Sequence, residues 1–259
     1  MSTDVIVAVE GGNASVRLAR PQVRNAFNAE VIAALTSAFE RLGSDPAVRS
    51  IVLSGEGAAF CGGADVNWLR ASLALTHTEN VAEASAMSDM FRTIDRCGKP
   101  VVARVHGAAL GGGAGLAAVC DIVVAAEGTL FGFTEVKLGI IPAVISPFVV
   151  AKIGASNARA LFLTGERFDA RRAQAIGLVH EIVAPGDLDA AVERVLSELR
   201  SAGPQAVAAA KQMIFDVRAA GYDDSRTLTA EAIARQRTSA EGQEGLLAFL
   251  ERRKASWLR

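Results

Sequence analysis

The sequence predicts an α/β domain in which buried strands alternate with helices before a helical C-terminal third. Three short apolar runs read as buried strands: SIVLSG (50–55), PVVARV (100–105) and DIVVAA (121–126). Strands that alternate with helices at this spacing are typical of crossover connections and parallel pairing, with both faces of the sheet covered. The 259 residues, 51% of them hydrophobic and 21% charged, suit one compact soluble domain.

The other N-terminal elements follow from local patterns. Two β-branched runs flank Gly-Gly-Asn in VIVAVEGGNASVRLAR (5–20), which predicts a hairpin. Apolar residues at helical spacing from Val31 to Leu42, followed by Gly43, predict a helix. Residues 79–97 predict a second, more polar helix.

Beyond residue 143 the periodicity is helical throughout. Several segments begin at Asp or Ser and end at Gly, as helices do. We expect helices in ISPFVVAKIG (145–154), SNARALFLTG (156–165), DARRAQAIGLV (169–179), DLDAAVERVLSELRSAG (187–203), PQAVAAAKQMIFDVRAAG (204–221) and TAEAIARQRTS (229–239).

Charge and cysteine content exclude several classes of protein. The formal net charge of −1 gives no reason to expect nucleic acid or an anionic membrane as a partner. The three cysteines lack the spacing of a disulfide framework or a zinc site, so we expect free thiols and no metal. The N-terminal stretch has no basic leader and no apolar run reaches membrane-spanning length. These features predict a cytoplasmic protein.

Two loops carry the chemistry that the sequence suggests. Each follows a buried strand, contains small residues and leads into a helix: EGAAFCGGADV (56–66) and HGAALGGGAGL (106–116). Ligands bind at strand ends of α/β sheets, and the first N–H groups of a helix lack internal partners. Two such loops facing each other would offer two backbone donors to one oxygen atom, which is an oxyanion hole.

The glycines also have a purely structural interpretation. They permit tight turns or close packing of a helix, and for either loop alone this interpretation is adequate. A phosphate-binding loop is disfavoured, because neither the P-loop pattern nor the spacing of a dinucleotide fingerprint is present.

Five motifs occur in an order and spacing that resemble the enoyl-CoA hydratase/isomerase (crotonase) superfamily. They are RPQVRNAFN, AFCGGADV, HGAALGGGAGLAAVCDIVVA, FGFTEVKLGIIP and LTGERFDARRAQAIGLV. The resemblance implies a spiral of β-β-α units in residues 1–200. It also implies that residues 201–259 form a helical region that packs on this core and on neighbouring subunits of a homotrimer or hexamer.

The resemblance also implies the site. The thioester carbonyl of an acyl-CoA would lie between the N–H groups of Ala64 and Gly112, with no cofactor beyond the coenzyme A of the substrate itself. Residues 66–90 would cover the acyl chain. The substrate and its CoA moiety would lie along Val23, Arg24, Gly62, Asp65, Val66 and Gly111, with Arg252 and Arg253 near a CoA phosphate. A solvated basic tail is an equally good interpretation of that arginine pair.

Glu135 is the expected catalytic acid/base, although a surface or helix-capping carboxylate is the alternative. Hydratases of the superfamily use two glutamates, and Gly115 stands where the other would be. The second-acid position is therefore expected to be vacant. Single-glutamate members of the superfamily include isomerases.

Three functions remain open on this sequence. The first is hydration of a 2-enoyl-CoA. The second is Δ3,Δ2-enoyl-CoA isomerisation or another single-acid reaction, and the third is acyl-CoA binding with little catalysis. The run GIIPAVISP resembles hydratases of branched methylglutaconyl or isohexenylglutaconyl type. On that hypothesis a carboxylate of the substrate, or a neighbouring polar group, orders water in place of the missing glutamate.

Overall fold

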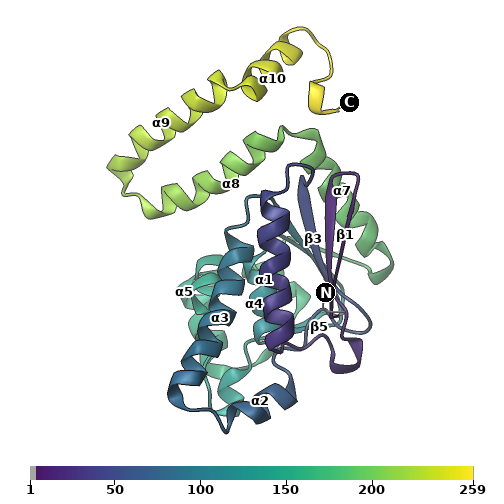
Figure 1. The fold of residues 1–259 in the computed structure, drawn as a ribbon, viewed down its shortest axis with the longest axis vertical. Coiled ribbons are helices and arrows are strands. Elements are labelled where there is room, and N and C mark those ends of the chain that lie inside the picture. Colours follow the sequence, from purple (N-terminus) through teal and green to yellow (C-terminus); the bar gives the residue numbers. More distant parts are fainter. Residues whose placement is uncertain (1–3, 259) are drawn as a thin grey trace.

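The computed structural model describes residues 4–258 and contains two β-sheets (Figure 1). The larger sheet has the order β1-β2-β3-β4-β6-β9, and the smaller has the order β5-β7-β8. The strands of the larger sheet are β1 (Val5–Glu10), β2 (Asn13–Leu18), β3 (Ser50–Gly55), β4 (Val101–Val105), β6 (Ile122–Ala126) and β9 (Glu181–Val183). Those of the smaller are β5 (Ala108–Leu110), β7 (Leu130–Gly132) and β8 (Arg167–Asp169).

Strand pairing confirms the predicted α/β class. β1 and β2 form the expected antiparallel hairpin, and every other neighbouring pair in the larger sheet is parallel. Gly11 and Gly12 form its turn with positive φ angles of 55° and 80°, a conformation that glycine adopts without strain. The β2–β3 and β3–β4 connections contain helices, as parallel crossovers require.

Ten α-helices surround the sheets among the described residues. They are α1 (Ala29–Ser44), α2 (Val66–Ser72), α3 (His77–Asp95), α4 (Gly112–Val119), α5 (Ser146–Thr164), α6 (Ala170–Ala175), α7 (Leu188–Ser201), α8 (Pro204–Ala219), α9 (Tyr222–Thr238) and α10 (Ala240–Leu250). Helix α3 starts two residues earlier than predicted because Thr76 and Glu79 form a reciprocal capping box.

The larger sheet is covered on both faces. Helices α1 and α3 pack with the main hydrophobic core, whereas Leu188, Val192 and Leu196 of α7 pack on the opposite face, against Val102 and Val124. Helix α4 lies in the interior, and all eight of its residues are buried. The segment that carries the three consecutive glycines is therefore fixed by packing on every side.

Beyond residue 143 the chain is mainly helical, as predicted, but it also contains the short strands β8 and β9, which the sequence analysis did not expect. The two helices expected between residues 145 and 165 form one run, α5, interrupted at Gly154, whose φ of 76° and ψ of 157° are not helical. Helices α8, α9 and α10 extend beyond the sheets as an arm, drawn in green to yellow in Figure 1. The Lys211 ammonium joins this arm to the core through Asp121, at 2.8 Å.

The structure also describes the cysteines and bears on membrane-spanning helices and metal sites. Cys61, Cys97 and Cys120 are free and buried. Within residues 4–258, no helix combines the length and apolarity that a bilayer crossing needs, and no group of three or more His, Cys, Asp or Glu side chains is arranged to hold a metal ion. The prediction about a leader concerns the N-terminal stretch, and residues 1–3 of that stretch lie outside the described residues.

Candidate active site

Backbone hydrogen bonds bring the two glycine loops side by side. Cys61 and Ala109 form an isolated parallel bridge, in which the Cys61 N–H donates to Ala108 O and the Leu110 N–H donates to Cys61 O, both at 3.0 Å. Phe27 forms a second parallel bridge with Ala64. The ends of both loops are thus held by main-chain pairing rather than by flexible side chains.

The N–H groups of Ala64 and Gly112 are both left without an acceptor among the described residues. In the bridge to Phe27, the bonds are made by the flanking Gly63 O and Asp65 N–H, so the Ala64 N–H lies outside that pairing. Gly112 is the first residue of α4, and the first internal acceptor bond of that helix is made by Gly115 N–H to Gly111 O. Two free donors at fixed positions are what an oxyanion hole needs.

Ala64, Gly112 and Glu135 line one cavity of about 370 Å³. Most of its wall is apolar. It is formed by Gly62, Gly63, Ala64, Trp68, Leu69, Ala84, Met87, Gly111, Gly112, Thr134, Glu135, Leu138, Ile140, Ile141, Pro142, Ala143, Val144 and Ile145. A concave, largely apolar pocket with a few convergent polar groups is the usual form of a small-molecule site. Trp68, Leu69, Ala84 and Met87 belong to the segment expected to cover an acyl chain.

Glu135 is the titratable group in this wall. It begins a short 3₁₀ helix, Glu135–Leu138, which ends at Gly139 in the left-handed conformation. Burial raises the pKa of the Glu135 carboxyl above its usual value, and its Oε2 atom is buried without a hydrogen-bond partner among the described residues. A β-carbon at Gly111 would lie 3.2 Å from Oε1, so glycine there allows the carboxylate close to the α4 start. A carboxyl of raised pKa is suited to exchange protons near neutral pH.

Buried apolar side chains surround Gly115, the residue that stands where a second glutamate was expected to be missing. A β-carbon at residue 115 would lie 2.4 Å from Cγ2 of Ile145 and 3.2 Å from Cε1 of Phe91. Ile145 is only 2% exposed and lines the cavity. An apolar methyl group therefore lies against the residue at which the superfamily pattern has its second glutamate.

The close-packing interpretation of the glycines also holds in part. A β-carbon at Gly113 would meet the Cys61 carbonyl oxygen at 2.3 Å, and one at Gly112 would meet Phe27 at 2.8 Å and Met87 at 2.9 Å. Gly113 is therefore explained by helix packing alone. Gly112 both packs closely and lines the cavity.

Asp65, expected along the substrate path, has a structural partner that sequence reasoning missed. Its carboxylate caps α2 by accepting from Asn67 N–H and pairs with the Arg20 guanidinium at 2.9 Å. Burial raises its pKa, but these hydrogen bonds and the arginine charge outweigh burial and hold that pKa below its usual value. Arg20 also donates to Ala26 O, so this one side chain ties together both sides of the Ala64 loop.

The remaining predicted contacts lie in this loop, at the start of α2 and in a segment that is bonded to the loop. The Gly62 N–H donates to Arg24 O at 2.8 Å, and Arg24 has a left-handed φ of 53°. Val23 is half-buried in a 3₁₀ turn, and Val66 is exposed at the start of α2. Neither lines the cavity described above.

The two C-terminal arginines differ. Arg253 is held by a bidentate pair with Glu244, both contacts at 2.8 Å, and by Glu251 at 2.7 Å. Arg252 is exposed, with a left-handed φ of 54°. Within one subunit, Arg252 is thus the more available of the two for a phosphate.

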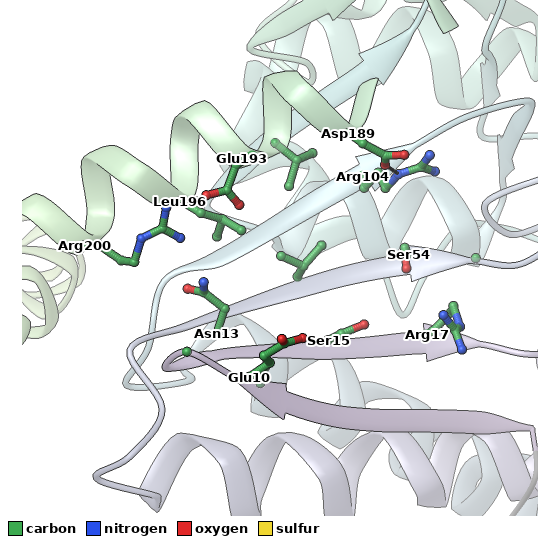
Figure 2. Close-up of a pocket in the computed structure, with 15 residues that line it drawn as sticks. Glu10, Asn13, Ser15, Arg17, Ser54, Arg104, Asp189, Glu193, Leu196 and Arg200 are labelled. Atoms are coloured by element: carbon green, nitrogen blue, oxygen red, sulfur yellow. Dashed lines mark hydrogen bonds and ion pairs between the residues drawn. The ribbon is translucent and has the colours of Figure 1, made fainter. Parts of the chain in front are cut away.

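A larger hollow, of about 730 Å³, lies elsewhere, between α7 and the outer face of β2 and β3 (Figure 2). Its three arginines each face a carboxylate: Arg17 pairs with Glu56, Arg104 with Asp189 and Arg200 with Glu193. These arginines are already paired with carboxylates of the chain, so they are not free to bind an anionic substrate. The greater volume of this hollow is therefore no reason to place the reaction site there.

Comparisons with known proteins identify the family and the fold of this chain. A family profile described as "Enoyl-CoA hydratase/isomerase" matches residues 9–259. A crotonyl-CoA hydratase of Syntrophomonas wolfei is 32% identical over 257 residues, which cover 98% of each chain. The structure of an enoyl-CoA hydratase from Shewanella pealeana superposes with a TM-score of 0.94 at 36% identity, covering 98% of this chain and 96% of that one. For Pseudomonas aeruginosa AtuE the TM-score is 0.96 at 35% identity, with 99% and 100% covered.

The fold of the matched structures and the extent of these matches define an enzyme of the crotonase class. The chain belongs to the enoyl-CoA hydratase/isomerase family. The fold of these neighbours also confirms the predicted arrangement of an α/β spiral followed by C-terminal helices.

Proposed function

We propose that the protein adds water reversibly to the double bond of a 2-enoyl-CoA thioester. The observation that carries this proposal is that the free N–H groups of Ala64 and Gly112 and the carboxyl of Glu135 line one apolar cavity. The names of the relatives support hydration over other reactions of the family.

The proposed reaction needs one acid/base and one anion site. Water attacks the β-carbon while the Glu135 carboxylate takes one of its protons. The electrons of the double bond move onto the thioester oxygen, where the N–H groups of Ala64 and Gly112 stabilise the negative charge. Each donor of this kind contributes roughly 3–4 kcal/mol in known enzymes. The protonated Glu135 then gives its proton to the α-carbon, and the net change is the addition of one water molecule.

The raised pKa of Glu135 suits both halves of this sequence. Burial disfavours the ionised carboxylate, so a buried carboxyl binds a proton more tightly than one in water does. The base that accepts a proton from water is thus ready to act as the acid that delivers it. No second carboxylate lies among the cavity-lining residues, so Glu135 performs both steps.

An apolar acyl chain fits this cavity better than a dicarboxylic one. None of the lining residues is Lys or Arg, and Glu135 already contributes a negative charge. A substrate carboxylate placed beside it would lose water without gaining a counter-charge. The hypothesis that a substrate carboxylate orders the attacking water therefore has no support in these side chains.

Isomerisation is the second candidate, and Ile145 is the observation that favours it. With a methyl group in the second-acid position, Glu135 can move a proton between two carbons without any water being held. Mass spectrometry of the product from a 2-enoyl-CoA and a 3-enoyl-CoA separates the two reactions. Hydration adds the mass of one water to the first substrate, whereas isomerisation leaves the mass of the second unchanged.

The Glu135→Gln variant tests the catalytic role itself. We expect turnover to fall about 10²- to 10⁴-fold, the usual contribution of a positioned acid/base, with acyl-CoA binding retained. A protein that binds acyl-CoA but has no turnover even as wild type would instead be the acyl-CoA-binding protein of the third interpretation.

We also propose that the chain assembles as a homotrimer or a dimer of trimers. Exposed apolar side chains lie on the C-terminal arm, where Phe249 is 81% and Leu250 76% exposed. Contiguous apolar surface of this kind marks interfaces in soluble proteins. Arg252 follows directly on this stretch, and a neighbouring subunit is the natural place for it to reach a CoA phosphate.

A further inference from the structure

Trp68 forms part of the wall of two separate cavities. One is the candidate active-site cavity. The other is a groove of about 430 Å³ between α1 and α3, lined by Ala29, Ile32, Ala33, Thr36, Ser37, Glu40, Trp68, Glu83, Ala86 and Asp89. No other residue lines both cavities. The Trp68 side chain is therefore a partition between them.

Neighbouring residues of α3 face the two sides of this partition. Ala84 and Met87 line the active-site cavity, whereas Glu83 and Ala86 line the groove. The first turns of α1 contribute Ala29, Ile32 and Ala33 to the groove, and the following turns contribute Thr36, Ser37 and Glu40. If Trp68 moved aside, an acyl chain that entered from the active site would meet a groove with small and apolar side chains along part of its wall.

The partition is held by one polar contact. The indole Nε1–H of Trp68 donates to Glu83 Oε1 at 3.2 Å. The ring also packs against the main core together with Met87. A long, weak hydrogen bond to a half-exposed carboxylate is easily replaced by water, so this contact sets a preferred position without locking it.

The helix that carries Trp68 is lightly anchored. None of the seven residues of α2, all of which the structure describes, is buried, and Leu73 after its last turn is 86% exposed. At its other end, Asp65 is fixed by Arg20. Segments with few buried contacts open at low free-energy cost, so α2 can shift at Trp68 while the Ala64 loop stays in place.

We propose that Trp68 determines acyl-chain length by closing the active-site cavity against the α1–α3 groove. This inference rests on the proposed function, because it needs an acyl-CoA in the cavity. Short acyl chains fit on the near side of the indole. Chains that reach the indole bind only if the ring moves out from between the two cavities, which removes its bond to Glu83 and exposes part of the ring.

The test is an affinity series measured by calorimetry with saturated acyl-CoAs from butanoyl to hexadecanoyl, which do not react. Each methylene that enters an apolar site tightens binding about fourfold. In the wild type we expect this increase to stop at the length that reaches Trp68. In Trp68→Ala the increase continues past that length, so the longest chains bind at least about tenfold more tightly than to the wild type.

Two further variants and a control sharpen the result. Glu83→Ala leaves the ring but removes its acceptor, and we expect the limit to relax in the same direction by a smaller factor. Trp68→Phe keeps an aromatic wall, so its limit stays near that of the wild type. Leu73→Ala truncates an exposed side chain that lines neither cavity and leaves the series unchanged.

The possible outcomes separate the two proposals. If wild type and Trp68→Ala bind short chains alike and level off at the same length, with Glu83→Ala also unchanged, the role of Trp68 is overturned while acyl-CoA binding stands. If the wild type binds no acyl-CoA of any length, both proposals fail together. Because the ligands do not react, a failure of Glu135 catalysis leaves the test intact.

Discussion

The Cγ2 atom of Ile145 occupies the space that a side chain on Gly115 would need, 2.4 Å from the ideal β-carbon position. In the superfamily pattern that position belongs to a carboxylate. Ile145 is almost fully buried, so it cannot turn away into solvent. The glycine and the isoleucine are therefore a matched pair, and together they give Glu135 an apolar neighbourhood on that side.

Gly115→Ala is expected to destabilise the protein although alanine is the better helix former. Overpacking a buried site costs about 1–3 kcal/mol, and the gain in helix propensity offsets about 1 kcal/mol of that. We expect a net loss of up to about 2 kcal/mol in the free energy of unfolding by urea. Gly186→Ala is the control, because its β-carbon meets no atom within 4 Å. Equal stability of the two variants would contradict the pairing with Ile145.

Glu135→Gln is expected to raise stability at neutral pH while it removes activity. Because burial raises the pKa of Glu135 in the folded protein, its ionisation destabilises the fold increasingly as pH rises from the usual glutamate pKa through the raised value. The gain of the variant over wild type should therefore be present near pH 8 and absent near pH 4, about the value of an unperturbed glutamate. Urea unfolding at the two pH values measures it. A gain of equal size at both would mean that the carboxyl is not desolvated.

Glu79→Gln is expected to change the pH dependence of stability in the direction opposite to that of Glu135→Gln. Hydrogen bonds from the Thr76 side chain and backbone hold the pKa of Glu79 below its usual value, so its ionised form stabilises the cap of α3. That contribution is present above the usual glutamate pKa and is lost as pH falls through the lowered value. Relative to the wild type, Glu79→Gln should therefore show no gain in the free energy of urea unfolding as pH rises.

Asp65→Asn isolates the ion pair with Arg20. Asparagine caps a helix as well as aspartate does, so the variant keeps the α2 cap and loses the charge that faces Arg20. A hydrogen bond to a charged partner contributes about 1.5–3 kcal/mol, and we expect a loss of that size in urea unfolding at pH 7. Asp169→Asn is the matched control, because Asp169 is exposed and caps α6 by accepting from Arg172 N–H. This substitution should lower the free energy of unfolding by less than about 0.5 kcal/mol.

Leu250→Asp is expected to dissociate the proposed oligomer. A charge placed in a desolvated apolar contact has no counter-charge and weakens association strongly. Light scattering after size exclusion should give a smaller mass for this variant than for the wild type. Leu73→Asp, on an exposed leucine directly after α2, should leave the mass unchanged, because α2 lies at the opposite end of the molecule from α10 (Figure 1). A wild type that is already monomeric would contradict the assembly.

Patterns of long elements were sufficient to predict the α/β class, the hairpin and most helices. The β5, β7 and β8 strands have three residues each, too few to produce a periodic signal. Their sheet exists because Ala109 pairs with both Cys61 and β7, a tertiary effect that no local window contains. Gly154 was visible in the sequence as a helix stop. The sequence did not show that the segments on either side of it form one run, α5.

Site residues that belong to a continuous sequence motif could be predicted. Site residues that act through a partner far away in the sequence could not. The two glycine loops and Glu135 stand out in the sequence, and the structure brings them to one cavity. Arg20, Trp68 and Ile145 do not, because each acts through a residue far along the chain: Asp65, Glu83 and Gly115 respectively. The only local signal for Ile145 was the absence of the glutamate itself.

A crystal structure with a saturated short-chain acyl-CoA bound is the most direct test of the oxyanion hole. We expect the thioester oxygen within about 2.7–3.1 Å of both the Ala64 and the Gly112 nitrogen atoms, the distance of working oxyanion-hole donors, with the acyl chain between Glu135 and Trp68. A thioester oxygen bonded to water or to a side chain, with either nitrogen atom more than a hydrogen bond away, would contradict the assignment of the site.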